Sequence, residues 1–320
     1  MSEPVLEVRD LSVRFHVPGG RPVQAVSGVS FCIARGETLG VVGESGSGKS
    51  SIARALLRLV PAAGGEVRFR GTDLLALGGK QLRDMRRHIQ IIFQDPLASL
   101  DPRMNVGEII AEPLRERRRD LTAAARRDKV LDMMQRVGLL PADLNRYPHE
   151  FSGGQAQRIG IARALVLEPE LLVCDEPISA LDVSIKSQIA NLLKDLQRQT
   201  NLSLLFIAHD LAAVRFSCDR VLVLYLGRVM EVAPRSALFA APRHPYTRAL
   251  LQSVPIADPV RARARRTAPL AAEIPSPLAP PSGCVFRTRC PHAVALCAAQ
   301  VPLPRMVGES LVACHRADEL

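Results

Sequence analysis

The sequence predicts an α/β fold with a largely parallel sheet and helices on both of its faces. A glycine-rich loop at residues 43–50 joins an apolar run at 38–42 to a helix-forming run at 52–59. Farther along the chain, short apolar runs alternate with helical patterns, as in parallel strands that are connected by helices. These later runs lie at residues 171–174, 202–208 and 221–226.

The loop at residues 43–50 reads Gly-Glu-Ser-Gly-Ser-Gly-Lys-Ser, which is the spacing of a phosphate-binding P-loop. Its glycines allow backbone N–H groups to approach a phosphate, and the following helix adds the positive end of its dipole. We expect Lys49 to reach the β- and γ-phosphates and the Ser50 hydroxyl to bind Mg²⁺. The motif predicts binding of a nucleoside triphosphate, without saying how its energy is used.

Short strands with alternating apolar and polar residues surround this loop in the sequence. Those before it are predicted at residues 5–10, 11–15 and 23–33, and another at 66–70 follows the helix after the loop. Turn residues separate the strands, so we expect an antiparallel β layer.

A predicted helix at residues 81–87 and a buried strand at 89–93 come next. Apolar residues then recur at helical spacing over 105–137, and again over 155–168, where Pro169 ends the pattern. We expect the stretch from about 100 to 165 to be a helical insertion that interrupts the sheet.

The second half of the chain returns to alternating elements and then changes composition. Helices are predicted at residues 183–198 and from 210, and a strand at 229–232. After residue 254 proline and arginine become frequent, which predicts an extended linker that leads to a small module with four cysteines. We therefore divide the chain into a first domain, 1–254, and a linker with C-terminal module, 255–320.

The composition favours a large globular protein outside the membrane. The chain has 320 residues, of which 47% are hydrophobic, so a sizeable core is expected. No run of 18 apolar residues predicts a membrane span, and residues 1–4 lack the pattern of a signal peptide. We expect a protein that stays in the cytoplasm.

The net charge is +10, and arginine supplies most of the excess. Arginines cluster at residues 115–119, 126–127 and 261–266. Such clusters serve nucleic acids, anionic membrane surfaces or simply solvent. Three tyrosines and no tryptophan supply little for base stacking, so we predict no nucleic-acid partner.

Two acidic residues follow the apolar run at 171–174. A nucleoside triphosphatase needs a carboxylate for Mg²⁺ and a group that orients the attacking water, both near the phosphate-binding loop. Asp175 fits the first role and Glu176 fits the second.

A second anion site is predicted at residues 151–155, Phe-Ser-Gly-Gly-Gln, where a helix begins. Ser152 suits a helix N-cap, and the glycines expose backbone amides. One nucleotide has no obvious use for two such sites on one chain.

Taken in order over residues 5–250, these motifs resemble those of the ATP-binding subunits of ATP-binding-cassette (ABC) transporters. Residues 43–50 resemble the Walker A motif, residues 151–155 the signature sequence, and residues 171–176 the Walker B motif with its catalytic glutamate. Gln94 matches the Q-loop and residues 179–182 the D-loop, and His209 matches the switch histidine.

The resemblance implies a P-loop NTPase fold with a RecA-like core, an antiparallel β subdomain and a helical subdomain. Two such subunits would pair head to tail, so that each ATP lies between the loop of one and the signature of the other. The implied ATP contacts on the loop side are Phe15, which stacks on adenine, Gly43, Ser45, Gly46, Gly48, Lys49, Ser50, Ser51 and Asp175. Those to the partner's ATP are Ser152, Gly153, Gly154 and Gln155.

The resemblance also assigns the chemistry of hydrolysis. Glu176 would polarise water, and His209 would contact the γ-phosphate. Gln94 would sense Mg²⁺, which Ser50 and Asp175 also hold. Ser51, Phe151 and Ala156 depart from the more usual residues, but no catalytic position is lost, so we expect an active site.

The tail resembles the dipeptide and oligopeptide importer branch at residues 243–251 and 283–291. Cys284, Cys290, Cys297 and Cys314 have the spacing C-x5-C-x6-C-x16-C, which is not that of a paired C-x2-C zinc site. Four thiolates in a cytosolic protein are metal ligands more often than disulfides. The branch and the four-sulfur count imply a 4Fe–4S cluster, with Zn²⁺ and unliganded cysteines as alternatives.

The resemblance implies an ATPase that powers import of dipeptides or oligopeptides across the cytoplasmic membrane. It would lie on the cytoplasmic face of the inner membrane, with a second ATPase subunit in a heterodimer, two transmembrane permease subunits and a periplasmic or extracellular solute-binding protein. The helical insertion after Gln94 would contact the permeases. A nickel-chelate or glutathione importer, or a soluble ABC ATPase that does not transport, are the alternatives. Soluble members usually carry two cassettes or a coiled-coil insertion, and this chain has neither.

Overall fold

The computed structural model describes residues 3–16, 20, 22–179, 181–253 and 273–320. The predicted linker after residue 254, with its arginine cluster at 261–266, falls largely outside these residues, as do residues 1–2 and Ala180 of the predicted D-loop. The described chain forms two compact units. The first consists of Met1–Glu7, Cys32–Thr38 and Arg68–Ala208, and the second of Val8–Phe31, Leu39–Val67 and His209–Leu320. The predicted boundary at residue 254 stays a prediction.

Parallel strands form the centre of the first unit. Strands β6 (Ile89–Ile92), β7 (Leu171–Asp175) and β8 (Ser203–Ile207) pair in that order. Every residue of β7 and β8 is buried, which accounts for their continuous apolar sequences, since a strand covered on both faces has no polar side.

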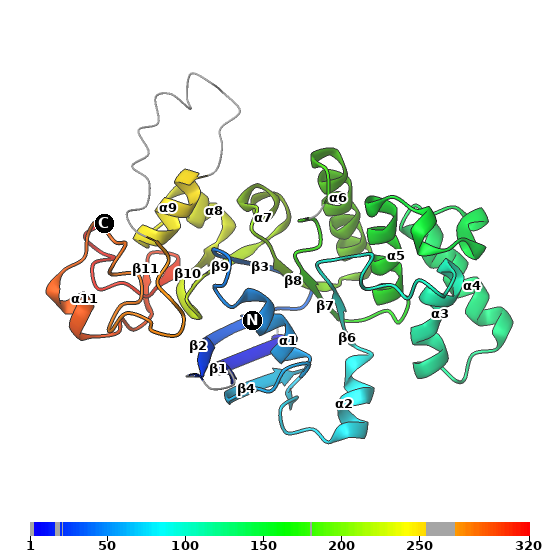
Figure 1. The fold of residues 1–320 in the computed structure, drawn as a ribbon, viewed down its shortest axis with the longest axis horizontal. Coiled ribbons are helices and arrows are strands. Elements are labelled where there is room, and N and C mark those ends of the chain that lie inside the picture. Colours follow the sequence, from blue (N-terminus) through cyan, green and yellow to red (C-terminus); the bar gives the residue numbers. More distant parts are fainter. Residues whose placement is uncertain (1–2, 17–19, 21, 180, 254–272) are drawn as a thin grey trace. The chain divides into compact units, whose positions relative to one another are not determined.

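Helices make up the rest of the first unit. The stretch with the helical pattern forms α3 (Val106–Arg117), α4 (Ala123–Arg136) and α5 (Gly153–Leu165), which lie beside one another in Figure 1. Two short 3₁₀ helices, η1 (Pro141–Asn145) and η2 (Pro148–Glu150), connect α4 to α5. The remaining helices are α2 (Gly79–Arg86) and α6 (Val183–Thr200).

A four-stranded sheet has the order β2-β1-β4-β5. Its strands are β1 (Leu6–Phe15), β2 (Val23–Ile33), β4 (Gly64–Phe69) and β5 (Thr72–Asp73). The two strands predicted at 5–10 and 11–15 are one strand, because Asp10 takes a left-handed conformation (φ 48°) without interrupting it. The Asp10 N–H donates to the Ser30 hydroxyl at 2.9 Å, which links this part of β1 to β2.

The second unit has a sheet of mixed direction. Strand β3 (Thr38–Val42) is parallel to β9 (Arg220–Tyr225), which is antiparallel to β10 (Arg228–Pro234). The C-terminal hairpin of β11 (Arg305–Val307) and β12 (Ser310–Val312) extends it, since Glu231 of β10 pairs with Val312. The helices are α1 (Lys49–Leu56), α7 (Leu211–Ser217), α8 (Arg235–Ala240), α9 (Pro245–Ser253) and α11 (Ala295–Ala299).

Aromatic side chains pack the C-terminal segment against β9. The ring of Tyr225 lies 4.7 Å from that of Tyr246 and 5.4 Å from that of Phe286, measured between centroids. All three residues are buried, so the segment after residue 272 shares the core of the second unit. In the part of the chain that the structure describes, no helix has both the length and the apolar character that a bilayer crossing requires.

Candidate functional site

The glycine-rich loop leads from β3 to α1, as its sequence predicts. Gly48 precedes the helix with φ +103°, and a Cβ atom there would lie 2.3 Å from the Ala25 carbonyl oxygen. At Gly43 a Cβ atom would lie 2.1 Å from the Leu224 carbonyl oxygen. Only glycine fits either position, so the loop backbone can follow the tight path that a phosphate cradle needs.

Lys49 is buried at the first position of α1, and only 4% of it is exposed. Its ammonium donates to the carbonyl oxygens of Gly43 at 2.8 Å and Glu44 at 3.0 Å. It also donates to Nδ1 of His209, 3.4 Å away. The structure therefore brings two predicted site residues together that are 160 positions apart in sequence.

The other residues predicted to contact ATP from the loop side differ in their exposure. Ser45 and Gly46 are exposed at the tip of the loop, and Ser50 and Ser51 are half-buried in the first turn of α1. Phe15 ends β1 and is 38% exposed, so its ring is available for contact with another group.

Glu44 has partners that the sequence did not predict. Its carboxylate accepts hydrogen bonds from Nη1 and Nη2 of Arg289, at 2.6 and 3.0 Å, and its N–H donates to the Tyr246 hydroxyl at 3.0 Å. Hydrogen bonding to Glu44 raises the pKa of Arg289, and burial raises the pKa of Tyr246. In the sequence, Tyr246 and Arg289 stand out only because residues 243–251 and 283–291 resemble an importer branch. That resemblance gave no reason to place them beside the loop.

Asp175 and Glu176 lie at the carboxyl end of β7 in the first unit. They are 2% and 5% exposed, respectively. Glu176 has φ +51°, and its N–H donates to the Ile207 carbonyl oxygen at 3.1 Å. The side-chain amide of Gln94 donates to Glu176 Oε2 at 2.8 Å, so the predicted Q-loop residue touches the predicted base.

Ser152 caps α5, as predicted. Its hydroxyl accepts a hydrogen bond from the Gln155 N–H at 3.4 Å, and its own N–H donates to Gln155 Oε1 at 3.1 Å. Ser152, Gly153 and Gln155 are exposed, whereas Gly154 is buried against α6. A Cβ atom on Gly154 would lie 2.6 Å from Cγ2 of Ile185, so this glycine allows close helix packing.

The four C-terminal cysteines all lie within the described residues. Cys284 and Cys297 are buried, and the Cys284 N–H donates to the Cys297 carbonyl oxygen at 2.8 Å. Burial raises the pKa of Cys284 to about 11, and the neighbouring thiols of Cys297, Cys314 and Cys290 add to the rise. No group of three or more His, Cys, Asp or Glu side chains in the described part of the chain is arranged to hold a metal ion. The structure therefore gives no support to the predicted 4Fe–4S cluster or to its Zn²⁺ alternative.

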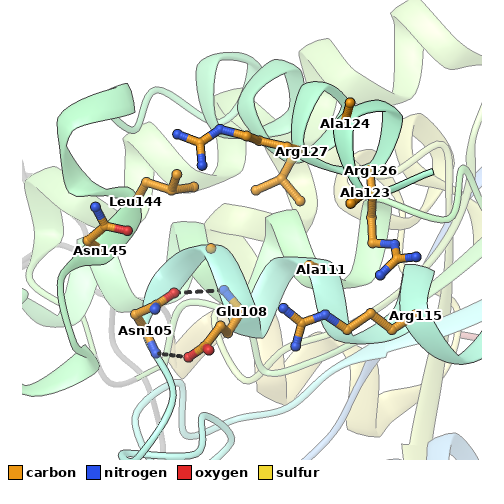
Figure 2. A pocket seen from close by; sticks show the side chains of 12 residues that line it. Asn105, Glu108, Ala111, Arg115, Ala123, Ala124, Arg126, Arg127, Leu144 and Asn145 are labelled. Carbon is orange, nitrogen blue, oxygen red and sulfur yellow. Dashed lines mark hydrogen bonds between the residues drawn. The ribbon is translucent and has the colours of Figure 1, made fainter. Parts of the chain in front are cut away.

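A cavity of about 450 Å³ opens between α3, η1 and α4 in the first unit. Figure 2 shows Arg115, from α3, and Arg126, from α4, reaching into the space between the two helices. Arg127 also lines the cavity, and Nε of Arg126 is buried without a hydrogen-bond partner among the described residues. No described carboxylate forms an ion pair with these three arginines. Glu108 also lines the cavity, where its carboxylate accepts a hydrogen bond from the Asn105 N–H at 3.0 Å. The three arginines outnumber this carboxylate, so the cavity suits a negatively charged group.

Known families match both halves of the chain. The family described as "ABC transporter" matches residues 26–179. The family described as "Oligopeptide/dipeptide transporter, C-terminal region" matches residues 230–297.

Relatives match over nearly the full length. "Oligopeptide transport ATP-binding protein OppF" of Salmonella typhimurium is 53% identical, over 99% of this chain and 97% of the relative. The protein of that name in Haemophilus influenzae is 54% identical, over 94% and 93%. A "putative peptide import ATP-binding protein" of Brucella ovis is 53% identical, over 95% of each chain.

Solved structures show the same fold. The ATP-binding cassette MJ0796, a dimer in a post-hydrolysis state bound to ADP and Pi, superimposes with a TM-score of 0.66 at 28% identity, over 72% of this chain and 98% of that chain. CbiO1 of Clostridium perfringens, part of the ABC transporter complex cbiONQ, gives a TM-score of 0.66 at 27% identity, over 75% and 92%. The chain therefore has the ABC ATPase fold, and it belongs to the family of ATP-binding subunits of oligopeptide and dipeptide ABC transporters.

Proposed function

We propose that this chain binds and hydrolyses ATP to power the import of oligopeptides or dipeptides by an ABC transporter. The observation that carries the proposal is the near full-length similarity to relatives named oligopeptide transport ATP-binding proteins. Lys49, Glu176 and His209 are all present, which supports an active member of the family rather than one that only binds ATP.

In the proposed reaction the loop at residues 43–50 holds the phosphates. Lys49, held by the loop carbonyls, binds the β- and γ-phosphates, and the Ser50 hydroxyl, Gln94 and Asp175 would hold Mg²⁺. All three kinds of group fit this role, because hydroxyl, amide and carboxylate oxygens suit Mg²⁺. When bound, Mg²⁺ neutralises charge on the phosphates.

Glu176 acts as the base that orients the attacking water, and His209 contacts the γ-phosphate. The burial of Glu176 and its hydrogen bond from Gln94 support this role, because a positioned carboxylate needs a fixed orientation. Phe15 stacks on adenine, and its exposed ring supports that contact.

A second ATPase subunit completes the site. The start of α5 would contact the partner's ATP through Ser152, Gly153 and Gln155. These residues are exposed, and their position at a helix N-terminus supports binding of a phosphate. Gly154 keeps this helix start close against α6. We propose that the partner is a different chain, so that the pair is a heterodimer.

Permease subunits bind the first unit through the helical stretch after Gln94. The cavity lined by Arg115, Arg126 and Arg127 supports this contact, because an acidic side chain of a permease loop would pair with arginines that have no carboxylate partner in the described chain. The protein would then be peripheral, on the cytoplasmic face of the inner membrane.

A periplasmic or extracellular solute-binding protein would deliver the peptide.

The C-terminal cysteines are proposed to hold a 4Fe–4S cluster, with Zn²⁺ as the alternative. The residue types and the four-sulfur count support this. As they lie, the four side chains do not form a ligating group, so a cluster would require them to move.

The test of the main proposal is the Glu176→Gln variant, purified with its partner ATPase. We expect it to bind MgATP, to form a stable pair, and to hydrolyse ATP at about one hundredth of the wild-type rate or less. Hydrolysis at the wild-type rate would show that another group is the base, and wild-type protein that never hydrolyses ATP would contradict the proposed function.

A further inference from the structure

The C-terminal segment of the second unit reaches the phosphate-binding loop through one side chain. Arg289 donates from Nη1 to Glu44 Oε2 at 2.6 Å and from Nη2 to Glu44 Oε1 at 3.0 Å. Arg289 is buried, so water screens this ion pair only weakly. We propose that Arg289 is a positioning residue for ATP binding that acts on the loop through Glu44. This rests on the proposed function, because the loop must bind ATP.

A second contact fixes the same loop residue at its backbone. The Glu44 N–H donates to the Tyr246 hydroxyl at 3.0 Å. Tyr246 and Arg289 both lie in the region that matches the oligopeptide/dipeptide transporter description, and neither lies in the ABC transporter match. The loop is therefore held at two points by the part of the chain that distinguishes this branch from a bare ATP-binding cassette.

Glu44 carries one of the two loop carbonyls that hold Lys49. The Glu44 oxygen accepts hydrogen bonds from Lys49 Nζ at 3.0 Å and from the Ser47 N–H at 3.2 Å. A displacement of Glu44 would disturb both contacts. The hydrogen bonds thus run without a gap from Arg289 through Glu44 to Lys49, the residue proposed to bind the phosphates.

Charge gives Arg289 a second effect on the loop. Glu44 puts a carboxylate in a loop that has to accept a triphosphate, and like charges repel each other strongly where water is partly excluded. The two parallel hydrogen bonds from Arg289 neutralise the carboxylate and fix its direction. Without Arg289, an unpaired negative charge would remain beside the phosphate cradle.

Aromatic residues hold the guanidinium of Arg289 in place. It lies 5.7 Å from the centroid of the Tyr225 ring, and Nη1 donates to the Tyr225 hydroxyl at 3.4 Å. The Phe286 ring packs against both Tyr225 and Tyr246. Nε of Arg289 has no hydrogen-bond partner among the described residues, so the contacts of the guanidinium are directed to Glu44 and Tyr225.

The test is the dissociation constant for MgATP, measured on the full chain in a Glu176→Gln background that prevents turnover. We expect Arg289→Ala to raise this constant about tenfold or more, because it leaves a partly buried carboxylate unpaired. Arg289→Lys should give a smaller rise. Adding Glu44→Gln to Arg289→Ala should restore part of the affinity, because it removes the unpaired charge. An unchanged constant in Arg289→Ala would overturn the proposal.

Steady-state kinetics with Glu176 intact and the partner ATPase present separate positioning from a loss of structure. Arg289→Ala should raise the KM for ATP while kcat at saturating ATP stays within about twofold. A fall in kcat with KM unchanged would mean that Arg289 does not act on ATP binding.

Two further variants complete the test. Arg287→Ala removes an arginine of the same segment that donates only to Ser282 in the described structure, and it should leave the affinity unchanged. Tyr246→Phe removes one hydroxyl but keeps the packed ring, so it should fold and weaken MgATP binding about threefold. If the parent protein fails to bind MgATP, the proposed function is wrong. If the parent binds and all variants bind equally, only the positioning role is wrong.

Discussion

The side-chain amide of Gln94 donates a hydrogen bond to the carboxylate of Glu176 across 2.8 Å. The two residues are 82 positions apart and follow two adjacent strands, β6 and β7, at their carboxyl ends. Glu176 has a left-handed backbone (φ +51°), which costs energy in a residue other than glycine. The backbone and the hydrogen bond from Gln94 therefore both contribute to its orientation.

Removal of this contact should slow hydrolysis more than it weakens binding. We expect Gln94→Ala to lower kcat for ATP about tenfold, because a general base that is free to rotate is less often in position. The dissociation constant for MgATP should change much less. Phosphate release and equilibrium nucleotide binding measure the two effects, and a variant with unchanged kcat would contradict the positioning of Glu176 by Gln94.

Replacement of Lys49 should abolish tight ATP binding. We expect Lys49→Ala to raise the dissociation constant for MgATP about 100-fold, because it removes the charge-assisted contact to the phosphates. Lys80→Ala, on the exposed start of α2, is the matched control and should bind as the parent does. If Lys49→Ala binds MgATP like the Lys80 variant, Lys49 has no role in the site.

His244 should make the fold sensitive to acid. Burial lowers the pKa of His244 to about 3 from its ordinary 6.5, and its Nδ1 accepts a hydrogen bond from the Tyr246 N–H at 3.0 Å. Between these two pH values the unfolded chain binds a proton that the folded chain does not. Stability should therefore fall as pH drops below 6.5, by about 1.4 kcal/mol per pH unit.

Denaturant unfolding at several pH values checks this prediction with one variant and one control. His244→Asn keeps an acceptor for the Tyr246 N–H but cannot titrate. Between pH 6 and 5 its free energy of unfolding should therefore lack the fall of about 1.4 kcal/mol that His244 causes. His149→Asn changes an exposed histidine and should keep the slope. A full slope in His244→Asn would show that other groups cause the acid sensitivity.

Iron and acid-labile sulfide measure the proposed cluster in the tail. After anaerobic purification of the full chain we expect both to be present, and Cys290→Ser should lose them. Stoichiometric zinc would favour the alternative metal. Protein that folds and contains neither metal would leave four reduced cysteines and contradict both proposals.

Charge reversal in the arginine-lined cavity should weaken the contact with the permeases. We expect Arg126→Glu to reduce co-purification of permease subunits while MgATP binding by the isolated chain is unchanged. Lys129→Glu is the control, since Lys129 lies on the same helix but pairs with Glu168 outside the cavity. Equal co-purification with both variants would show that the cavity does not bind the permeases.

Local spacing made the catalytic motifs predictable. The loop at residues 43–50, the acids after β7 and the cap at Ser152 each depend on a few adjacent residues, so their chemistry can be read without knowing the fold. The resemblance then supplied their order and the roles of Gln94 and His209. The contact between Lys49 and His209, 160 positions apart, is not part of any local motif.

Contacts between distant parts of the chain were not predictable. Arg289 lies 245 positions from Glu44, and no local pattern pairs them. The addition of β12 to β10 depends on a three-residue strand, which is too short for an alternating pattern. The break predicted inside β1 was wrong for a local reason, since polar Asp10 can adopt the left-handed conformation within a strand.

The most direct test of the central claim is ATP-driven peptide uptake by the complete transporter, reconstituted in lipid vesicles with its solute-binding protein. With the wild-type chain, labelled oligopeptide should accumulate only when ATP is supplied on the ATPase side. With Glu176→Gln, uptake and phosphate release should both stop while ATP stays bound. Undiminished uptake with the Glu176→Gln chain would contradict the claim that hydrolysis at this site powers import.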